Sequence, residues 1–339
     1  MSQEELLQFQ QEIYQAKCEL AREDINEFIE LCFLDDDTQE PIVQQWFHRK
    51  MQAMLPDQPA KVMYILPRGS GKSQQMSVFR TVWDLGKNPN LRIKIITATD
   101  NLAVTLLNGI KKAIENNEHV RNVFPRLRPS DQESWTTHRI MVERSSGTGH
   151  PSVEALGVLS TGAGGRSDRN IYDDVVDMKN SILMPTLRDH VKQSIRETWQ
   201  PLLVPTGTEI WNATPYHHLD ATNELRNADD SEWMRLIIPA ILSKDVDLNE
   251  VVNRKGRKIE LFAASFAEGK SYWPTKWTFQ ELEKKRRSSP RGFDKQYLLK
   301  IVPEEEAIFP PGDIVRCLNL ENSLWDVDLA KGVPRYIDP

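Results

Sequence analysis

The feature that most constrains the fold is a glycine-containing turn between an apolar run and a helical pattern. Residues 62–66 (VMYIL) are typical of a buried strand, residues 67–73 read PRGSGKS, and residues 74–85 have helical spacing. A strand that ends in such a turn before a helix forms a phosphate-binding site, because backbone N–H groups and the positive end of the helix dipole face the anion. The pattern predicts an ATP site in which Lys72 reaches the β- and γ-phosphates and the Ser73 hydroxyl holds Mg²⁺.

The turn departs from the usual P-loop pattern at one position. A glycine is expected five residues before Gly71, but Leu66 stands there, and Arg68 adds a cation to the loop. The alternative is a glycine turn that only caps a helix, and the apolar strand in front of it favours the ATP site. The residues expected to contact the phosphates are Arg68, Gly69, Ser70, Gly71, Lys72 and Ser73.

The composition is that of a globular protein. The chain has 339 residues, 39% hydrophobic and 27% charged, a length that suggests about two domains. No run approaches the ~20 apolar residues of a membrane helix, and the acidic N-terminus lacks a signal-peptide core. Cys18, Cys32 and Cys317 lie far apart, which suits a reducing cytoplasm and forms no metal-ligand spacing. With a net charge of −6, any contact with DNA is expected to be a local basic patch.

Strand and helix patterns alternate after the P-loop. A strand is expected over 91–97 and a helix over 101–114, and strand followed by helix, twice in succession, predicts an α/β fold with a parallel sheet and crossover helices. Further strands are expected over 135–142, 152–158, 209–215, 233–238 and 259–264, and further helices over 3–33, 41–48 (with Pro41 in its first turn), 187–200, 275–287 and 293–299.

A second informative segment joins glycines, arginines and paired acids. Residues 160–165 are rich in glycine, Arg166 and Arg169 follow, and a short strand is expected to end at Asp173 and Asp174. In P-loop ATPases an acid at a strand end helps to hold Mg²⁺, and the next acid can orient the attacking water. Asp173 is expected in the first role and Asp174 in the second. Adjacent aspartates also occur in solvated loops, but their position about 100 residues after the P-loop lysine favours the site.

Four other polar features can also be interpreted from the sequence. Gln45 could read the adenine edge, since a side-chain amide both donates and accepts, or it is a solvated helix residue. The Thr214 hydroxyl, at the end of a strand, could sense the γ-phosphate. His217 and His218 have no partner at metal spacing and are expected at the surface. The basic run 284–291 could bind DNA phosphates, but a solvated helix terminus is the preferred interpretation.

Together these segments resemble the large terminase subunit of tailed bacteriophages, the motor that packs DNA into proheads, and in particular the form found in short-tailed phages. The resemblance runs from about Pro41 to the end of the chain and depends on the order and separation of its motifs. These are PRGSGKS at 67–73, PSV at 151–153, GRSD at 165–168 before DDV at 173–175, Ala213-Thr214-Pro215, and residues 293–297 followed by a proline-bearing linker and Phe309.

The resemblance implies an additional-strand (ASCE-type) P-loop NTPase with a mostly parallel sheet flanked by helices and a small lid subdomain. The expected organisation is an N-terminal helical segment at 1–40, an ATPase core at 41–225, a lid or linker subdomain at 226–300, and a linker with the start of an RNase H-like nuclease at 301–339. Residues 336–339 resemble the first nuclease strand, in which Asp338 would be the first metal-binding acid. One carboxylate cannot form a two-metal site, so this chain is not expected to cut DNA.

The resemblance also implies roles for single residues. Arg166 is the expected arginine finger acting on the ATP of a neighbouring subunit, and Arg169 is the second choice. Many relatives have glutamate at the position of Asp174, and the aspartate side chain is one methylene shorter. Asp177 is the residue that would assist Asp174. The remaining roles are phosphate binding by Lys72 and Arg68, Mg²⁺ binding by Asp173, catalysis by Asp174, coupling by Thr214 and adenine contact by Gln45.

The expected activity is ATP hydrolysis, with Mg²⁺, coupled to translocation of double-stranded DNA by a homo-oligomeric ring in the host cytoplasm. The portal of the prohead and the small terminase subunit are the expected partners, and no membrane is involved. Three alternatives stay open. These are another P-loop translocase or helicase, which normally carries a second motor domain, a non-hydrolysing nucleotide-binding module, and a small-molecule kinase.

Overall fold

The structure is a computed structural model that describes residues 2–55, 60–131, 135–147, 149–162, 164–228 and 232–301, and the backbone of 325–328 and 333–336. The chain divides into two units, Met1–Lys300 and Ile301–Pro339. In the second unit, β11 (Trp325–Asp328) and β12 (Val333–Tyr336) form an antiparallel pair. The first unit holds every candidate site residue except Asp338, which lies outside the described residues.

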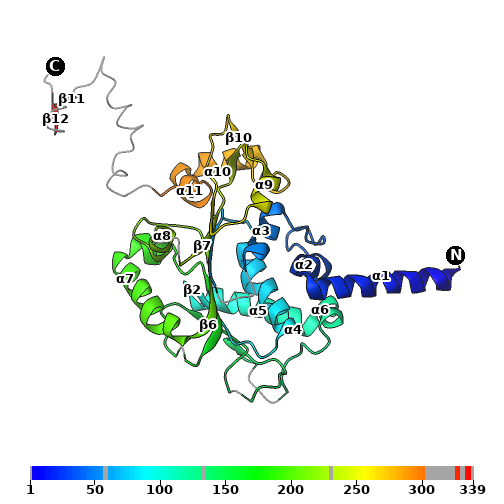
Figure 1. Cartoon of the computed structure of the whole chain (residues 1–339). Coiled ribbons are helices and arrows are strands. Elements are labelled where there is room, and N and C mark those ends of the chain that lie inside the picture. Colours follow the sequence, from blue (N-terminus) through cyan, green and yellow to red (C-terminus); the bar gives the residue numbers. More distant parts are fainter. Residues whose placement is uncertain are drawn as a thin grey trace. The chain divides into compact units, whose positions relative to one another are not determined.

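An eight-stranded sheet runs through the first unit (Figure 1). Its order is β3-β4-β2-β5-β6-β1-β7-β9, and every neighbouring pair is parallel except β3 with β4. The predicted α/β class with a mostly parallel sheet is confirmed, and β6 separates the P-loop strand β1 from β5. The strands are β1 (Lys61–Ile65), β2 (Ile93–Thr97), β3 (Arg139–Ile140), β4 (Val153–Gly157), β5 (Ser167–Asp173), β6 (Leu203–Ala213), β7 (Met234–Ile237) and β9 (Lys258–Glu260).

Helices cover both faces of the sheet (Figure 1). One face carries α2 (Ile25–Cys32), α3 (Trp46–Met54), the π-helix η1 (Gln74–Phe79) continued by α4 (Arg80–Lys87), α5 (Asp100–Asn116) and α6 (Glu118–Val123), with α1 (Gln3–Glu23) packed on this group near its C-terminal end. The other face carries η2 (Lys179–Leu183), α7 (Pro185–Ser194), η3 (Ile195–Trp199), the 3-10 turn η4 (Gln200–Leu202) and α8 (Ala221–Arg226).

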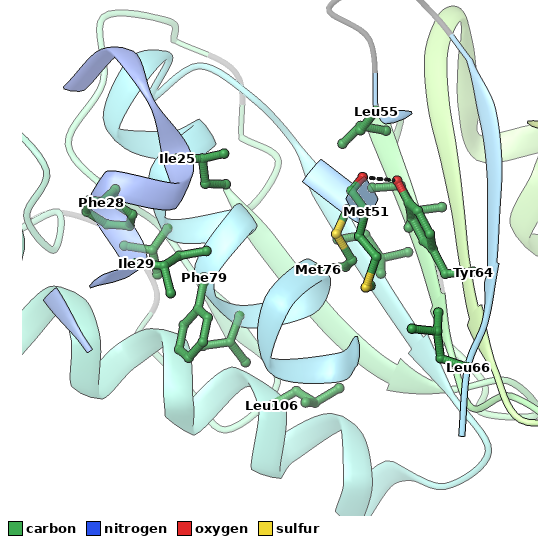
Figure 2. Close-up of a cluster of buried hydrophobic side chains, with 14 of the residues drawn as sticks. Ile25, Phe28, Ile29, Met51, Leu55, Tyr64, Leu66, Met76, Phe79 and Leu106 are labelled. Carbon is green, nitrogen blue, oxygen red and sulfur yellow. Dashed lines mark hydrogen bonds between the residues drawn. The ribbon is translucent and has the colours of Figure 1, made fainter. Parts of the chain in front are cut away.

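The P-loop strand is buried on both faces, as its unbroken apolar run predicts. Successive side chains of a strand point to opposite faces, so Val62 and Tyr64 join the core under α3 and α4, whereas Met63 and Ile65 join the core under α7. Figure 2 shows the first of these cores, in which the hydroxyl of Tyr64 donates to the carbonyl of Met51 at 2.8 Å. Full burial of one such side chain contributes about 1.5–3 kcal/mol, so β1 is firmly held behind the turn.

The second core combines aliphatic side chains with several large aromatic rings. Tyr172 of β5 and Trp211 of β6 lie side by side with ring centroids 4.9 Å apart. The buried indole N–H groups are satisfied, because Trp211 donates to the Thr222 hydroxyl at 3.1 Å and Trp199 donates to the Val158 carbonyl at 2.9 Å. These contacts fix β5 and β6 against the helices of that face.

Residues 232–300 belong to the same unit as the P-loop. Their strands β7 and β9 join the large sheet, while β8 (Ile241–Ser243) and β10 (Gly269–Ser271) form a separate antiparallel pair. Three helices complete this region: α9 (Leu248–Asn253), α10 (Phe279–Ser288) and α11 (Pro290–Gln296). The expected boundaries at residues 40, 225 and 300 stay a prediction, with the qualification that the sheet itself continues past residue 225.

Three segments differ from expectation. The predicted first turn at Pro41 is wrong, because α3 begins at Trp46 and Pro41 forms an isolated antiparallel bridge with Leu34. The segment is held extended there, since the amide of Ile42 donates to the Phe33 carbonyl at 3.1 Å.

The strands expected over 135–142 and 259–264 are both shorter than predicted, being reduced to the two residues of β3 and to Lys258–Glu260. A tight turn, in which the amide of Thr136 donates to the Arg139 carbonyl, shortens the first.

Among the helices that the structure describes, none combines the length and the apolar character needed to cross a bilayer.

Candidate functional site

Three neighbouring parallel strands end together at one edge of the sheet. β5, β6 and β1 are adjacent, with Asp173 level with Asn212 and Ile65 level with Ala213. The P-loop, the paired acids and the Asn212–Thr214 segment therefore meet at the carboxyl edge, where ligands bind in α/β sheets.

The turn after β1 depends on its two glycines. Gly69 has φ 76° and Gly71 has φ 81°, values that favour glycine over residues with a Cβ. A Cβ at Gly69 would also lie 2.8 Å from a ring carbon of Trp277. Between them, Ser70 is fully buried, and its hydroxyl has no hydrogen-bond partner among the described residues. The backbone is thus shaped as an amide nest with a spare buried hydroxyl.

Lys72, Asp174 and Thr214 come together beside this turn. The Lys72 ammonium donates to the Thr214 hydroxyl at 3.0 Å and lies 3.4 Å from Asp174 Oδ2. The amide of Thr214 donates to Asp174 Oδ1 at 3.2 Å. The side chain of Lys72 is 6% exposed and that of Asp174 is 34% exposed, so the acid faces solvent while the lysine does not.

Asp173 is held on both of its oxygens. The Ser73 hydroxyl donates to Oδ1 at 2.6 Å, and the Asn212 amide donates to Oδ2 at 3.1 Å. The Ser77 hydroxyl also donates to Oδ2. Burial, and secondly the charge of Asp174, raise the pKa of Asp173, while hydrogen bonds from the two serines act in the opposite direction.

Asp174 has an unusual backbone. Its φ is 43°, in the left-handed region that residues other than glycine enter rarely, and aspartate is among those that tolerate it best. The strain is held by hydrogen bonds on both sides, since the Asp174 amide donates to the Asn212 carbonyl at 2.9 Å and the Ala98 amide donates to the Asp174 carbonyl at 3.2 Å. The turn aims the Asp174 side chain at Lys72 instead of along the strand.

The donor set suits a small hard cation next to a phosphate. Mg²⁺ is usually held by one or two carboxylates, phosphate oxygens and waters, and Ser73 and Asp173 supply adjacent oxygens. A cation here would offset both effects that raise the pKa of Asp173. Within the described ranges, three or more His, Cys, Asp or Glu side chains nowhere gather into a cage made of protein ligands alone.

Gln45, at the start of α3, and Arg68, within the loop, differ in their contacts. Gln45 is the N-cap of α3, and its side-chain amide donates to the Val43 carbonyl at 3.1 Å. Arg68 is exposed, while its backbone amide donates to the Gln296 carbonyl at 3.0 Å. Their roles toward adenine and phosphate stay predictions.

The two candidate arginines have different surroundings. Arg166 is exposed and donates to the Pro201 carbonyl at 2.9 Å. It precedes β5, whose seven residues, at ~3.3 Å each, put it roughly 20 Å from the acids of its own chain. Arg169 instead forms a buried ion pair with Asp84 of α4, and burial followed by the charge of Arg80 lowers the pKa of Arg169 to about 9. The Arg169 side chain is thus largely buried and paired within its own chain, and Arg166 remains the candidate finger.

Nothing in the sequence singled out His48, which lies against the P-loop. Its side chain is buried, and its ring packs against Phe47 and Trp273. Burial lowers the pKa of His48 to about 4, and the charge of Lys276 acts in the same direction.

The depressed pKa of His48 predicts a loss of stability in mild acid. The unfolded chain takes up a proton near the ordinary value of 6.5 and the folded chain only near about 4, so stability is complete above 6.5 and falls as the pH falls through this window. Between about pH 7 and about pH 5 the expected contribution is about 2 kcal/mol. Urea denaturation should therefore show a smaller drop between these pH values for His48→Phe than for wild type, and equal drops would contradict the assignment.

The sequence also provides no indication of Ser77 and Asn212, and at His217 and His218 the structure differs from the expected surface position. A hydroxyl on a π-helix and an amide one residue from a strand end carry no motif, so only the fold shows that both reach Asp173. The expected surface position of His217 is wrong, because it is 3% exposed and its amide donates to the Asp220 carboxylate at 2.9 Å in a buried turn. His218 is half-buried.

The basic run at 284–291 lies mostly on the last turns of α10. Glu283 pairs with Arg286 at 3.1 Å and with Arg287 at 3.2 Å, and the Arg286 guanidinium lies 4.9 Å from the ring of Phe266. Cations at a helix C-terminus complement its dipole, and these contacts support the helix-terminus interpretation.

No protein-family model matches the sequence, and no curated protein sequence matches it either. Solved structures do match. The large terminase of bacteriophage HK97 superposes with a TM-score of 0.50 at 14% identity, covering 83% of this chain and 55% of that one. This chain has the fold of a phage large terminase. The ATPase domain of the Thermus phage P74-26 large terminase is also similar, with a TM-score of 0.43 at 17% identity, covering 75% of this chain and 93% of that domain.

The terminase fold confirms the resemblance seen in the sequence at the level of architecture. The chain spans about half the length of the HK97 terminase, since the match covers 55% of that protein. The expected likeness to the short-tailed-phage form stays a prediction.

Proposed function

We propose that this chain is the ATPase of a viral DNA-packaging motor. It binds ATP and Mg²⁺ at the carboxyl edge of its sheet and couples hydrolysis to translocation of double-stranded DNA into a prohead. The observation that carries the proposal is the convergence of Lys72, Asp174 and Thr214, at 3.0–3.4 Å from one another, on a terminase fold.

Phosphoryl transfer needs mainly positioning and charge stabilisation from the protein. The turn from Gly69 to Lys72 supplies amides, except that of Ser70, which donates to the Pro67 carbonyl at 3.2 Å, and the Lys72 ammonium supplies a cation. Lys72 now donates to Thr214 and pairs with Asp174. When Lys72 turns toward a phosphate, Asp174 keeps the Thr214 amide on Oδ1, while Oδ2 loses its cation. The partly exposed Oδ2 is then the atom that accepts a proton from water.

Ser73 and Asp173 are the residues that would hold Mg²⁺, which supplies charge neutralisation on the phosphates when bound. Ser77 and Asn212 hold the second oxygen of Asp173, so the carboxylate keeps one orientation. Thr214 contacts Lys72 through its side chain and Asp174 through its backbone, which places it to register the state of both.

Partners follow from the motor role. Arg166, exposed and remote from the acids of its own chain, suits a finger that enters the site of a neighbouring copy in a ring. The portal of the prohead, the small terminase subunit and double-stranded DNA are the proposed partners, and the host cytoplasm is the proposed location.

Lys72→Ala tests the nucleotide site. We expect ATP affinity to fall about 100-fold or more, because two charge-assisted bonds to phosphate each contribute about 1.5–3 kcal/mol. Binding of a fluorescent ATP analogue and phosphate release would be measured together. Lys87→Ala is the matched control and should bind as wild type. Lys87 is an exposed lysine at the end of α4, the helix that continues from the P-loop, and it pairs with Glu23 of α1.

Unchanged affinity in Lys72→Ala would refute the P-loop assignment. A wild-type protein that binds ATP tightly and releases no phosphate, even at high protein concentration and with DNA, would instead indicate the non-hydrolysing module.

A further inference from the structure

We propose that His48 is a positioning residue for the phosphate-binding loop. Its ring N–H holds the Ser70 carbonyl and thereby aims the Gly71 amide toward the bound phosphates. The inference rests on the proposed function and adds a residue from outside the P-loop to the machinery that shapes it.

The partners of the imidazole ring fix its tautomer. His48 Nε2 lies 2.7 Å from the Ser70 carbonyl oxygen, and His48 Nδ1 lies 3.3 Å from the backbone nitrogen of Gln45. A backbone N–H only donates, so Nδ1 is the unprotonated acceptor and Nε2 carries the proton. The neutral ring then donates to the Ser70 carbonyl and accepts from the Gln45 amide, so one tautomer satisfies both contacts.

Peptide geometry converts this bond into an orientation of the loop. A trans peptide is planar, and its C=O and N–H point in opposite directions. The described residues contain no cis peptide bond, so a Ser70 carbonyl that faces His48 requires the Gly71 N–H to point away from it. That N–H belongs to the residue just before Lys72, at the anion-binding start of the helix.

The ring of His48 also closes the space behind this peptide. A Cβ at Gly71 would lie 3.3 Å from His48 Nε2, tighter than ordinary contact. The ring itself is fixed by Phe47, with centroids 4.2 Å apart, and by the edge of Trp273, with centroids 5.3 Å apart. A rigid, buried donor of this kind keeps the loop in one conformation before nucleotide arrives, which lowers the ordering cost of binding.

A phosphate-only ligand separates this role from a role in reading the base. His48→Phe keeps the ring and its packing but removes the donor, whereas His48→Gln places an amide N–H at a comparable reach. His138→Phe is the matched control, because His138 Nδ1 also contacts a backbone carbonyl, that of Ala155 at 3.1 Å, on a strand far from the P-loop in the sheet order. The probes are ATPγS and inorganic triphosphate, with affinity measured by calorimetry and folding by thermal unfolding at neutral pH.

We expect His48→Phe to bind both probes about 10–100-fold more weakly, since one charge-assisted amide contact is misaligned. His48→Gln should return to within about threefold of wild type, and His138→Phe should match it. Folded His48→Phe with wild-type affinity for triphosphate would overturn the inference. So would folded His48→Gln that binds as weakly as His48→Phe, because the donated bond would then not be the cause. Wild-type protein that binds neither probe would refute the proposed function itself, which is a different result.

Discussion

Replacing Asp174 with asparagine is expected to lower the rate of ATP hydrolysis by about 10²–10⁴-fold while ATP binding persists, the range by which a general base usually contributes. Asparagine has the same size, and its carbonyl oxygen can still accept from the Thr214 amide, which now donates to Asp174 Oδ1 at 3.2 Å. What disappears is the negative charge near Lys72 and the ability to take a proton from water. Single-turnover hydrolysis and equilibrium binding, measured on the same preparation, separate the two effects.

Asp177→Asn is the matched control for this variant. Asp177 is the other acid of the segment, but its carboxylate accepts from the Asn180 amide at 2.7 Å at the start of η2, a bond that asparagine retains. We expect near wild-type hydrolysis from it. If Asp177→Asn lost activity and Asp174→Asn kept it, the catalytic acid would have to be reassigned to Asp177.

Removal of the Arg166 guanidinium should have a still larger effect on the assembled motor, about 10³–10⁵-fold in turnover, as is typical of an arginine finger. The guanidinium is exposed and lies at the opposite end of β5 from Asp173, so the site of its own chain is out of reach. Arg166→Ala should therefore leave ATP affinity of the isolated chain unchanged. Turnover of wild type should rise with protein concentration, as copies associate.

Mixing experiments give this prediction a sharp test. Lys72→Ala has a dead site but an intact finger, and Arg166→Ala has an intact site but no finger. Equal mixtures should recover part of the activity that each variant lacks alone. Wild-type turnover that is fast at every protein concentration, or mixtures that show no recovery, would rule out action between copies. Arg196→Ala, an exposed arginine paired with Glu224, controls for loss of surface charge.

Much of the site could be predicted because its parts are local in sequence. Gly69, Gly71, Lys72 and Ser73 occupy a single turn, and the apolar run before it already indicates a strand. Asp173 could be placed from the same logic, since a short apolar segment that ends in acids predicts a strand end. The parallel sheet then brings these ends to one edge.

The remaining features depend on contacts between distant parts of the chain. His48 carries no motif, and its partner Ser70 lies on another element. Ser77 lies four residues after Ser73, so both hydroxyls share one helix face, but only the fold shows that Asp173 of another element lies against that face. The positive φ of Asp174 likewise goes with backbone hydrogen bonds to Asn212 of β6 and to Ala98, just after β2, which the sequence around Asp174 does not reveal.

His217 shows the opposite error, in which a local interpretation was too simple. Two adjacent histidines without a metal partner were expected in solvent, but the turn after β6 folds back on Asp220 and buries the first of them. Burial of a polar ring depends on what packs over it, and the sequence near the ring does not contain that information.

The strand β6 connects the surroundings of Arg166 with the candidate site. It begins two residues after Pro201, whose carbonyl is the anchor of Arg166, and ends at Asn212 and Ala213, beside Thr214. Its register against β5 is irregular between Leu203 and Thr208 and regular from Thr208 to Asn212. A bulge bends a strand and interrupts its ladder locally, so a push by an adjoining copy at the Arg166 end would reach this irregular stretch first. In a ring built from such chains, a displacement there would pass along the regular part of β6 to the end that lies beside Thr214.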